Sequence, residues 1–295
     1  MTTPHLPESL PELEALAWNG PDVTSTKGAG DENFPVGSIL LGASERPAVH
    51  SYYRFARMAD DVSDTTRLPP QERIARLRVL GAVLRGQARA PNRTDAQCAA
   101  AVRTMLAQRH VPVEDAADLL VAFEMDVTKN RYQSWEELLH YCRYSANPVG
   151  RFLLNLHGEG EDILGPSDAL CTALQVINHL QDAGRDLARL DRCYLPQQWF
   201  EAEGVKVADL ALTHAKPGVR RVFDRALAYV DGLNAQAARL PGLIRNRRMR
   251  LEAAVVVALC HKLTRRLHDN DPLWKRVALT KADFARATVQ AFRHW

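Results

Sequence analysis

The stretch HSYYRFARMADDVSD, residues 50–64, carries the clearest helical pattern in the chain. Apolar residues recur in it at three- and four-residue spacing, at Tyr52, Phe55, Ala59 and Val62. Such spacing places side chains on one face of a helix. Period-two alternation, which would indicate strands, is scarce in the rest of the sequence. The pattern therefore predicts a helix here and a nearly all-α chain.

Prolines divide the remaining sequence into helix-sized blocks, because proline resists a helix interior. These blocks are rich in Ala, Leu, Arg, Glu and Gln, which lose little free energy on entering a helix. Residues 1–28 are Pro-rich and lead into STKGAGD, so we expect a flexible, loosely held arm there. Neither a linker nor a repeat divides the remainder, which predicts a single domain over residues 29–295.

Composition excludes several classes of protein. A chain of 295 residues that is 46% hydrophobic can bury a sizeable core. Its 38 Lys and Arg against 35 Asp and Glu leave a net charge of +3, too balanced for a protein that mainly neutralises nucleic-acid phosphates. The five cysteines are odd in number and form no CxxC pair, so neither a disulfide framework nor a zinc site is indicated.

The sequence shows no clear signal for secretion or for crossing a membrane. The N-terminus has acids and prolines where a secretory signal needs a basic start and an apolar run. The longest strongly apolar run, AAVVVALC at 253–260, is far shorter than the roughly 20 residues of a membrane span. These features and the unpaired cysteines predict a cytoplasmic protein without a transmembrane anchor.

A first acidic cluster lies within the opening stretch. Asp60, Asp61 and Asp64 project from one side of the predicted helix, and Tyr53 and Arg57 precede them on the same face. Acidic neighbours at this spacing repel one another by a few tenths of a kcal/mol per pair, which a bound cation would offset. A solvated acidic face beside arginines is the alternative that this motif alone leaves open.

A second cluster lies in LQVINHLQDAGRDLARLDRCYLP, residues 174–196. Gln175, Asn178, Asp182 and Asp186 step by three or four residues and form a polar stripe on an otherwise apolar helix. Burying the two amides without partners would be costly. The alternative is ordinary ion pairing of each aspartate with the arginine three residues further on.

Together, the two clusters suit diphosphate chemistry. Magnesium prefers hard oxygen ligands and usually bridges one or two carboxylates to phosphate oxygens. Two acidic helices facing each other across a cavity would hold several magnesium ions around one diphosphate. The metals and nearby arginines would stabilise the charge on a departing diphosphate and leave a carbocation in an apolar pocket.

The sequence resembles the head-to-head prenyl synthase family of squalene and phytoene synthases, and within it the bacterial enzymes of hopanoid biosynthesis that form hydroxysqualene. The resemblance extends from about Asp31 to Phe292. Its specific pieces are DENFPVGS at 31–38, YYRFARMADDVSD at 52–64, FEMDVTKNRY at 123–132, YCRYSANPVGRFLL at 141–154, NHLQDAGRDLARLDRCYLP at 178–196 and RLEAAVVVAL at 250–259.

The resemblance implies an all-α isoprenoid (terpenoid) synthase fold, a single helical domain around a central cavity. It implies that Mg²⁺ assists diphosphate loss from presqualene diphosphate, after which the cation rearranges and water quenches it to hydroxysqualene. No NADPH is expected, whereas squalene synthase quenches such a cation with hydride from NADPH. The sister prenyltransferase reactions, which condense farnesyl diphosphate to presqualene diphosphate or prenyl diphosphates to squalene or phytoene, stay open. A non-catalytic helical binding protein is the alternative of another class.

The resemblance also assigns roles residue by residue. The implied magnesium ligands are Asp60, Asp61, Asp64, Asp182 and Asp186. The implied catalytic residues are Tyr53, Arg57, Gln175, Asn178, Arg192 and Tyr194. Position 181 departs from phytoene synthases, which typically have arginine there; Gln181 fits a site that handles one diphosphate rather than two.

Further polar residues are candidates for binding substrate: Asn33, Phe34, Lys129, Arg131, Tyr141 and Ser145. Their structural alternatives are a helix cap for Asn33, a solvated helix end for Lys129 and Arg131, and core packing for Tyr141 and Ser145. Four isolated histidines, at 50, 140, 157 and 179, lack a metal-binding pattern and are interpreted as structural.

The basic stretch RNRRMR at 245–250 is either a solvated helix end or an attraction for anionic lipid headgroups. The implied substrate and product are both membrane-soluble, which makes peripheral association with the inner membrane face a hypothesis. RNA binding is disfavoured, because the total charge is near neutral and no aromatic residues are interleaved with the arginines. Partner enzymes earlier and later in the pathway are implied by resemblance only.

Overall fold

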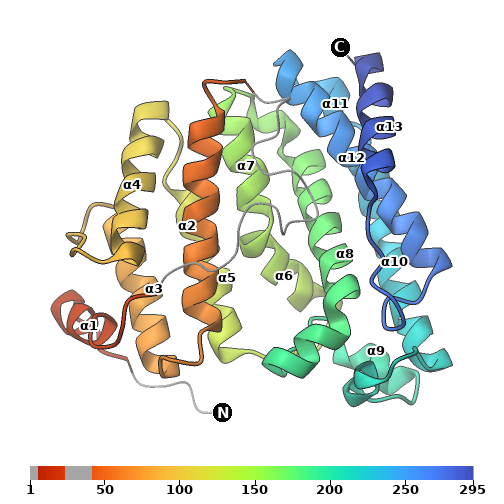
Figure 1. The fold of residues 1–295 in the computed structure, drawn as a ribbon, viewed down its shortest axis with the longest axis horizontal. Coiled ribbons are helices and arrows are strands. Elements are labelled where there is room, and N and C mark those ends of the chain that lie inside the picture. The colour runs from red at the N-terminus through yellow and green to blue at the C-terminus, as the bar shows by residue number, and fades with distance from the viewer. Residues whose placement is uncertain (1–5, 24–41, 295) are drawn as a thin grey trace. The chain divides into compact units, whose positions relative to one another are not determined.

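The computed structural model describes residues 6–23 and 42–294, and within these ranges it contains helices and no β-strand (Figure 1). The prediction of an all-α chain is confirmed. The candidates Asn33 and Phe34 lie outside the described residues. The α-helices are α1 Leu10–Ala17, α2 Arg46–Asp64, α3 Pro70–Leu84, α4 Thr94–Arg109, α5 Glu114–Thr128, α6 Trp135–Ser145, α7 Asn147–Leu156, α8 Leu164–Leu190, α9 Gln197–Ala202, α10 Pro217–Ala237, α11 Leu240–Leu243, α12 Arg247–Asp269 and α13 Lys281–Ala291, and the 3₁₀ helices are η2 Glu161–Ile163, η3 Val207–Ala211 and η4 Phe292–His294.

The helices group into two compact units. Of the described residues, the first unit comprises 6–23, 42–128 and 152–156, and the second comprises 129–151 and 157–294. The expectation of a single domain over 29–295 stays a prediction, and its boundary at residue 28 falls outside the described residues.

Prolines begin helices in both units, as their fixed backbone angle favours. A proline occupies the first or second position of α1, α2, α3, α10 and α11. Side-chain caps begin three further α-helices. The Ser134 hydroxyl accepts a hydrogen bond at the start of α6, the Asn246 side chain does so at the start of α12, and the Thr280 hydroxyl does so at the start of α13. The block between Pro112 and Pro148 holds two helices, α5 and α6, rather than one.

Helix α1 packs on α3 within the first unit, which differs from the expectation of a loosely held arm for this part of residues 1–28. Ala17 at its end is fully buried against α3. The buried Arg76 guanidinium on α3 donates to the carbonyls of Ala17 and Pro21 and forms ion pairs with Glu72 and Asp95. These bonds satisfy a charge that would be very costly to bury alone.

Helix α2 packs on α3, α4 and α5 in the first unit and buries the face that the sequence predicts. Tyr52, Phe55, Ala59 and Val62 are each at most 3% exposed. The Tyr52 ring stacks on Phe152 with a centroid distance of 4.0 Å. Because this face is held by the core, the opposite polar side of α2 is fixed in orientation.

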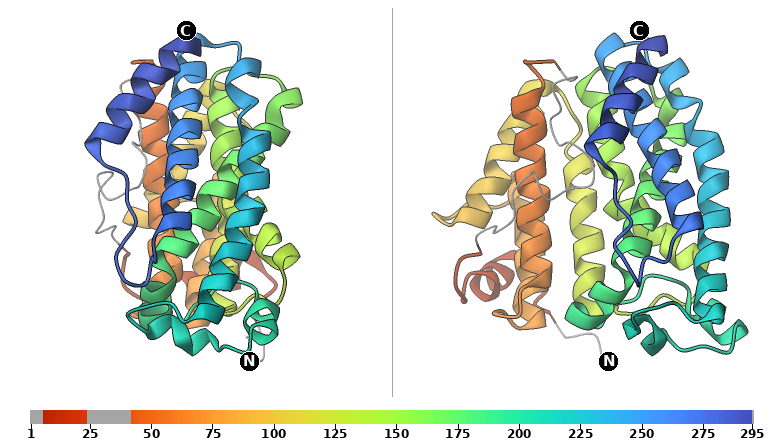
Figure 2. Two further views of the ribbon diagram at one scale, coloured as in Figure 1. Left: turned by 90° about the vertical axis from the view of Figure 1, so that its right-hand side faces the viewer. Right: turned by 45° about the vertical axis from the view of Figure 1, so that its right-hand side comes forward.

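Helix α8 is the longest described helix, at 27 residues, and packs on α6, α10 and α12 in the second unit (Figure 2). Val176, Ile177 and Leu180 are at most 1% exposed and form the core-facing side of this helix. The polar stripe of Gln175 and Asn178 is therefore turned partly away from the core, where both side chains are half-buried.

The end of α8 is tied to the segment that precedes α6. Asp191 caps α8 in the left-handed region at φ 49°, and its carboxylate lies 2.5 Å from Arg131. The Cys193 N–H donates to the Asn130 carbonyl, and the Gln197 N–H donates to the Tyr132 carbonyl. Residues 129–133 and 191–197 are therefore held side by side, which fixes the side chains that these segments carry.

Candidate active site

The first acidic cluster projects from α2 in the first unit. Arg57 donates to Asp60 Oδ2 at 2.7 Å across one helical turn, and both side chains are largely buried, at 17% and 25% exposed. Tyr53 lies one turn before Arg57 and is half-buried, as is Asp64 one turn after Asp60. These side chains, spaced three or four residues apart, thus form a continuous polar face on α2.

The surroundings of Asp60 disfavour the negative charge of its carboxylate. Burial, together with the negative charges of Asp64, Asp126 and Asp61, raises the pKa of Asp60 to about 7. The guanidinium of Arg57 opposes this shift without cancelling it. A carboxyl group held in this way is half protonated near neutral pH unless more positive charge arrives.

The donor set fits a hard cation such as Mg²⁺, which takes carboxylate oxygens as ligands. Asp61 supports this fit, because its Oδ2 atom is buried and has no hydrogen-bond partner among the described residues. Buried carboxylate oxygens are otherwise almost always bonded. In the part of the chain that the structure describes, however, no three His, Cys, Asp or Glu side chains converge tightly enough to form a preassembled metal site.

Asp126 is a member of this cluster that the sequence analysis did not single out. It lies on α5, is 4% exposed, and raises the pKa of Asp60 through its negative charge. The signal was present in the sequence: Asp126 follows Ala122 and Phe123 on the buried face of α5, where an acid has no packing role.

The second acidic cluster lies on α8 in the second unit. Asp182 is 18% exposed and forms an ion pair of 2.5 Å with the half-exposed Arg185. The sequence predicted this ion pair as one alternative to metal binding, and the structure contains the pair. Asp186, one turn further along, is half-buried.

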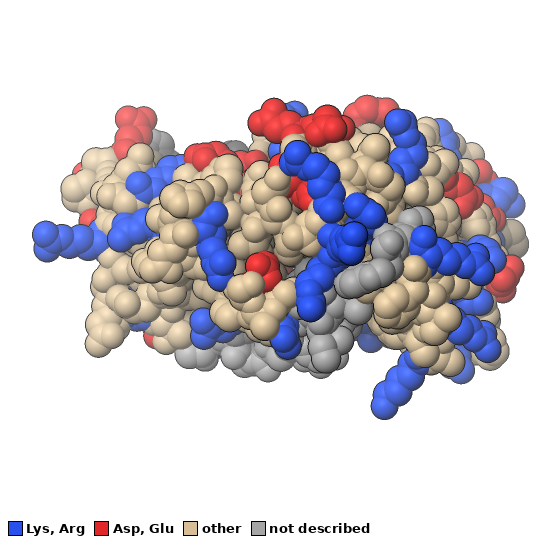
Figure 3. Space-filling view, turned by 90° about the horizontal axis from the view of Figure 1, so that it is seen from above, with Lys and Arg blue, Asp and Glu red and all other residues tan. Residues whose placement is uncertain are grey.

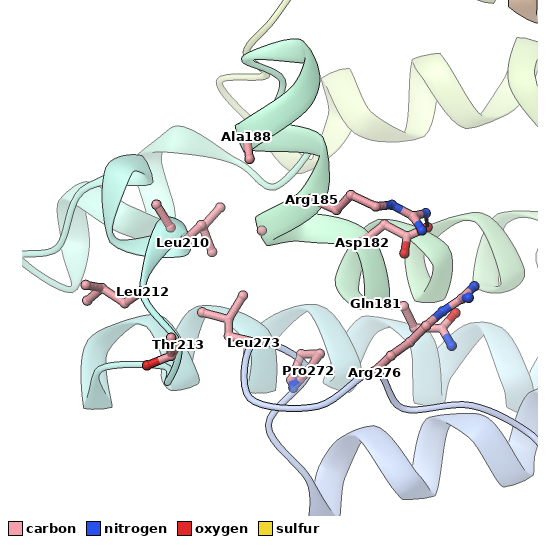
Figure 4. Close-up of a pocket in the computed structure, with 12 residues that line it drawn as sticks. Gln181, Asp182, Arg185, Ala188, Leu210, Leu212, Thr213, Pro272, Leu273 and Arg276 are labelled. Atoms are coloured by element: carbon pink, nitrogen blue, oxygen red, sulfur yellow. Dashed lines mark ion pairs between the residues drawn. The ribbon is translucent and has the colours of Figure 1, made fainter.

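A cavity of about 380 Å³ opens beside Asp182 within the second unit (Figure 4). Gln181 and Arg185 line it from α8, and Leu212, Leu273 and Arg276 line it from two loops. Gln181 is buried and its amide donates to the Val277 carbonyl. The residue that departs from phytoene synthases therefore joins α8 to the loop before α13.

An aromatic cluster in the second unit brings together three candidates from distant parts of the sequence. The hydroxyls of Tyr141 on α6 and Tyr194 lie 3.4 Å apart, and Arg192 donates to the Tyr194 hydroxyl at 3.1 Å. The ring of His179 stacks on Tyr194 at a centroid distance of 3.7 Å. Burial and the charge of Arg192 lower the pKa of His179 to about 3, so its imidazole is neutral.

The remaining candidates take up contacts of different kinds. Lys129 pairs with Glu137 on α6 at 2.9 Å, and Arg131 pairs with Asp191 at the end of α8. Both cations therefore attach the segment that follows α5 to these helices. The hydroxyl of Ser145, one turn after Tyr141 on α6, is buried without a hydrogen-bond partner among the described residues. The substrate-binding role of these residues stays a prediction.

The basic stretch at 245–250 lies at the N-terminus of α12. Arg245, Arg247 and Arg248 are exposed, and Arg245 pairs with Glu159 at 3.5 Å. Figure 3 looks onto the end of the molecule from which α12 begins and shows exposed Lys and Arg side chains on it. Of the described helices, none combines the length and apolarity that crossing a bilayer requires.

Comparison with known sequences gives consistent matches over most of the chain. A sequence model of the family described as squalene/phytoene synthase matches residues 28–285. A hydroxysqualene synthase of Rhodopseudomonas palustris is 40% identical over 92% of this chain and 91% of its own length. One of Zymomonas mobilis is 39% identical over 90% of this chain and 88% of its own. A phytoene synthase of Pseudescherichia vulneris is 30% identical over 69% of this chain and 68% of its own.

Comparison with solved structures agrees. A squalene synthase of Alicyclobacillus acidocaldarius superimposes with a TM-score of 0.68 and 31% identity, covering 88% of this chain and 94% of that one. A dehydrosqualene synthase superimposes with a TM-score of 0.76 at 20% identity, over 90% and 92% of the two chains. The expected isoprenoid-synthase fold is thereby confirmed.

Proposed function

Because the chain belongs to the squalene/phytoene synthase family, we propose that it converts presqualene diphosphate and water into hydroxysqualene and diphosphate. The observation that carries the proposal is the match to hydroxysqualene synthases, at 39–40% identity over at least 90% of this chain. The phytoene synthase match is lower and shorter, at 30% identity over 69%. The reaction is that of a carbon–oxygen lyase, with Mg²⁺ as the metal it requires.

The carboxylates of both acidic helices are the proposed magnesium ligands: Asp60, Asp61 and Asp64 on α2, and Asp182 and Asp186 on α8. Bound Mg²⁺ would supply positive charge to the oxygens of the leaving diphosphate. The raised pKa of Asp60 and the unpartnered Oδ2 of Asp61 support this role, because the cluster holds more negative charge than Arg57 compensates. A bound cation would add the missing positive charge.

In the proposed reaction the carbon–oxygen bond of presqualene diphosphate breaks, and its electron pair leaves with the diphosphate. Arg57 and Arg192 stabilise the charge that develops on that oxygen, since each guanidinium is permanently cationic and offers several donors. The rearranged cation accepts a lone pair from water, and the oxygen then loses a proton to give the alcohol. No step requires an external reductant, so NADPH is not a cofactor.

Squalene formation is a second candidate, supported by the structural match to a protein described as a squalene synthase at 31% identity. In that reaction hydride from NADPH replaces the attacking water. Condensation of two farnesyl diphosphates into presqualene diphosphate is the sister activity with a different substrate.

The decisive experiment supplies the full chain with presqualene diphosphate or farnesyl diphosphate, with Mg²⁺ or EDTA, with and without NADPH. We expect hydroxysqualene from presqualene diphosphate with Mg²⁺ alone, and one ¹⁸O atom in it when the reaction runs in H₂¹⁸O. Squalene formed only with NADPH would support the second candidate instead. Turnover of farnesyl diphosphate alone would identify a prenyltransferase, and no turnover of either substrate would favour a binding protein.

Peripheral association with anionic membranes is part of the proposal, because substrate and product are hydrocarbon-rich. Arginines at the N-terminus of α12 oppose the helix dipole, so they have no favourable role within the helix. We expect the protein to sediment with anionic vesicles at low salt, and Arg247→Gln with Arg248→Gln to weaken this several-fold. The control, Arg67→Gln with Arg89→Gln, removes equal charge from exposed positions elsewhere. Equal loss in both would contradict a specific surface.

A further inference from the structure

His179 is a polar residue on α8 that lies among aromatic rings and near the charge of Arg192. Its side chain is buried, at 7% exposed, and its ring stacks on Tyr194 with an interplanar angle of 18°. The ring of Tyr141 lies 5.8 Å away at a tilted angle. Packing alone would be served as well by phenylalanine, because stacking needs only an aromatic ring.

The Nε2 atom of His179 is buried and has no hydrogen-bond partner among the described residues. Leaving a buried polar atom unbonded costs about 1–3 kcal/mol, so native proteins rarely do so without a ligand or water to fill the position. The hydroxyl of Ser145 on α6 is in the same condition, and α6 packs on α8. An unbonded Nε2 atom at this buried position indicates a small polar ligand.

The surroundings of His179 favour a neutral hydrogen-bond donor as the ligand, because the positive charge of Arg192 acts on His179 and disfavours a cationic donor. The low pKa of His179 keeps its imidazole uncharged, so with a proton on Nδ1 it presents a lone pair at Nε2. The hydroxyls of Tyr141 and Tyr194, 3.4 Å apart, add neutral donors and acceptors. A water molecule matches such a set, since a buried water typically makes about three hydrogen bonds.

We propose that His179 Nε2, together with the hydroxyls of Tyr141 and Tyr194, holds the water molecule whose oxygen enters the product. The inference rests on the proposed function. The water donates one hydrogen bond to Nε2, and its oxygen lone pair forms the new bond to the cationic carbon. The proton then passes to Nε2, and the electron pair of the broken O–H bond stays on the oxygen. His179 thus orients the nucleophile.

The test replaces His179 by phenylalanine, which keeps the stacked ring and removes Nε2. Without an oriented water, the cation loses a proton instead and gives a hydrocarbon. We expect the ratio of hydroxysqualene to hydrocarbon products to fall at least tenfold in His179→Phe, measured by gas chromatography and mass spectrometry. His179→Gln, whose amide restores a hydrogen bond, should recover part of the alcohol. His140→Phe is the matched control, because His140 also contacts a tyrosine ring but is exposed.

An unchanged product ratio in His179→Phe overturns the inference. Complete loss of diphosphate release from a folded variant also overturns it, because it would place His179 in ionisation rather than in water capture. If the phenylalanine variant fails to fold, His179→Leu removes the same atom with a smaller side chain and is judged by the same ratio. Failure of the proposed function is distinguished in the wild-type protein, which would then form no alcohol at all.

Discussion

Helices α2 and α8 carry acidic motifs of similar spacing, yet the two are stabilised differently. On α2, Asp60 has one arginine near it and three carboxylates, and its pKa is raised to about 7. On α8, Asp182 has its own arginine at 2.5 Å, and that arginine is half-exposed. The arginine of the first motif therefore faces an excess of carboxylates, whereas the aspartate of the second has an arginine to itself.

The difference shows that the surroundings of an aspartate motif, and not its spacing alone, indicate whether it needs a bound cation. An aspartate in an i, i+3 pair near the surface gains about 0–1 kcal/mol from its partner and needs no metal to be stable. A buried aspartate among other carboxylates is stable as an anion only with an additional cation. Of the two helices, α2 therefore gives the stronger structural argument for magnesium.

The largest effect is expected at Asp60. Asp60→Asn removes a metal ligand from the more charged cluster, so diphosphate release from presqualene diphosphate should fall by about 1000-fold or more. Single-turnover kinetics with saturating Mg²⁺ measure this rate. Glu114→Gln, an exposed acid at the start of α5, is the control and should change it less than about twofold. A loss below tenfold in Asp60→Asn would remove α2 from the metal site.

A smaller effect separates the two interpretations of Asp182. Asp182→Asn should lower the same rate by about 100-fold, whereas Arg185→Gln should leave it within about threefold, because a half-exposed ion pair contributes little. Equal losses in both variants would mean that Asp182 acts through its ion pair and not through a metal.

The smallest effect concerns stability. Between pH 4 and 7, folded Asp60 retains a proton that the unfolded chain has released, because its pKa rises from 3.8 to about 7 on folding. The free energy of unfolding of the metal-free protein should therefore decrease as pH rises through this window, by about 2–3 kcal/mol between pH 5 and pH 8. Asp60→Asn should lack this decrease. Urea unfolding at pH 5 and pH 8 in EDTA measures it, and parallel behaviour of the two proteins would contradict the shift.

Sequence periodicity was sufficient for the fold class and for the faces of the two acidic helices. Tyr52 and Val62 on α2 are buried as predicted, and the polar stripe on α8 leaves Val176 and Ile177 buried beside it, because apolar spacing reports directly on burial. The ion pair between Asp182 and Arg185 was also foreseeable, because both residues lie on one helix three positions apart.

Contacts between distant segments were not predictable in this way. Asp126 reaches the α2 cluster from α5, and His179 meets Tyr194 only because the chain after α8 is bonded to residues 129–133. Neither residue belongs to a spacing pattern that names its neighbour. Lone polar residues on buried faces were the available signal, and they were interpreted as structural in the case of His179.

The buried guanidinium of Arg76 has a consequence for anyone who shortens this chain. Its bonds to the carbonyls of Ala17 and Pro21 make residues 10–21 part of the wall that encloses the ion pairs with Glu72 and Asp95. A recombinant version that begins after residue 23 would expose these charges to water and lose the apolar cover of α1. Trimming the N-terminus that far to aid crystallisation would therefore remove a structural support of α3, so a shortened version should keep α1 and the residues that follow it.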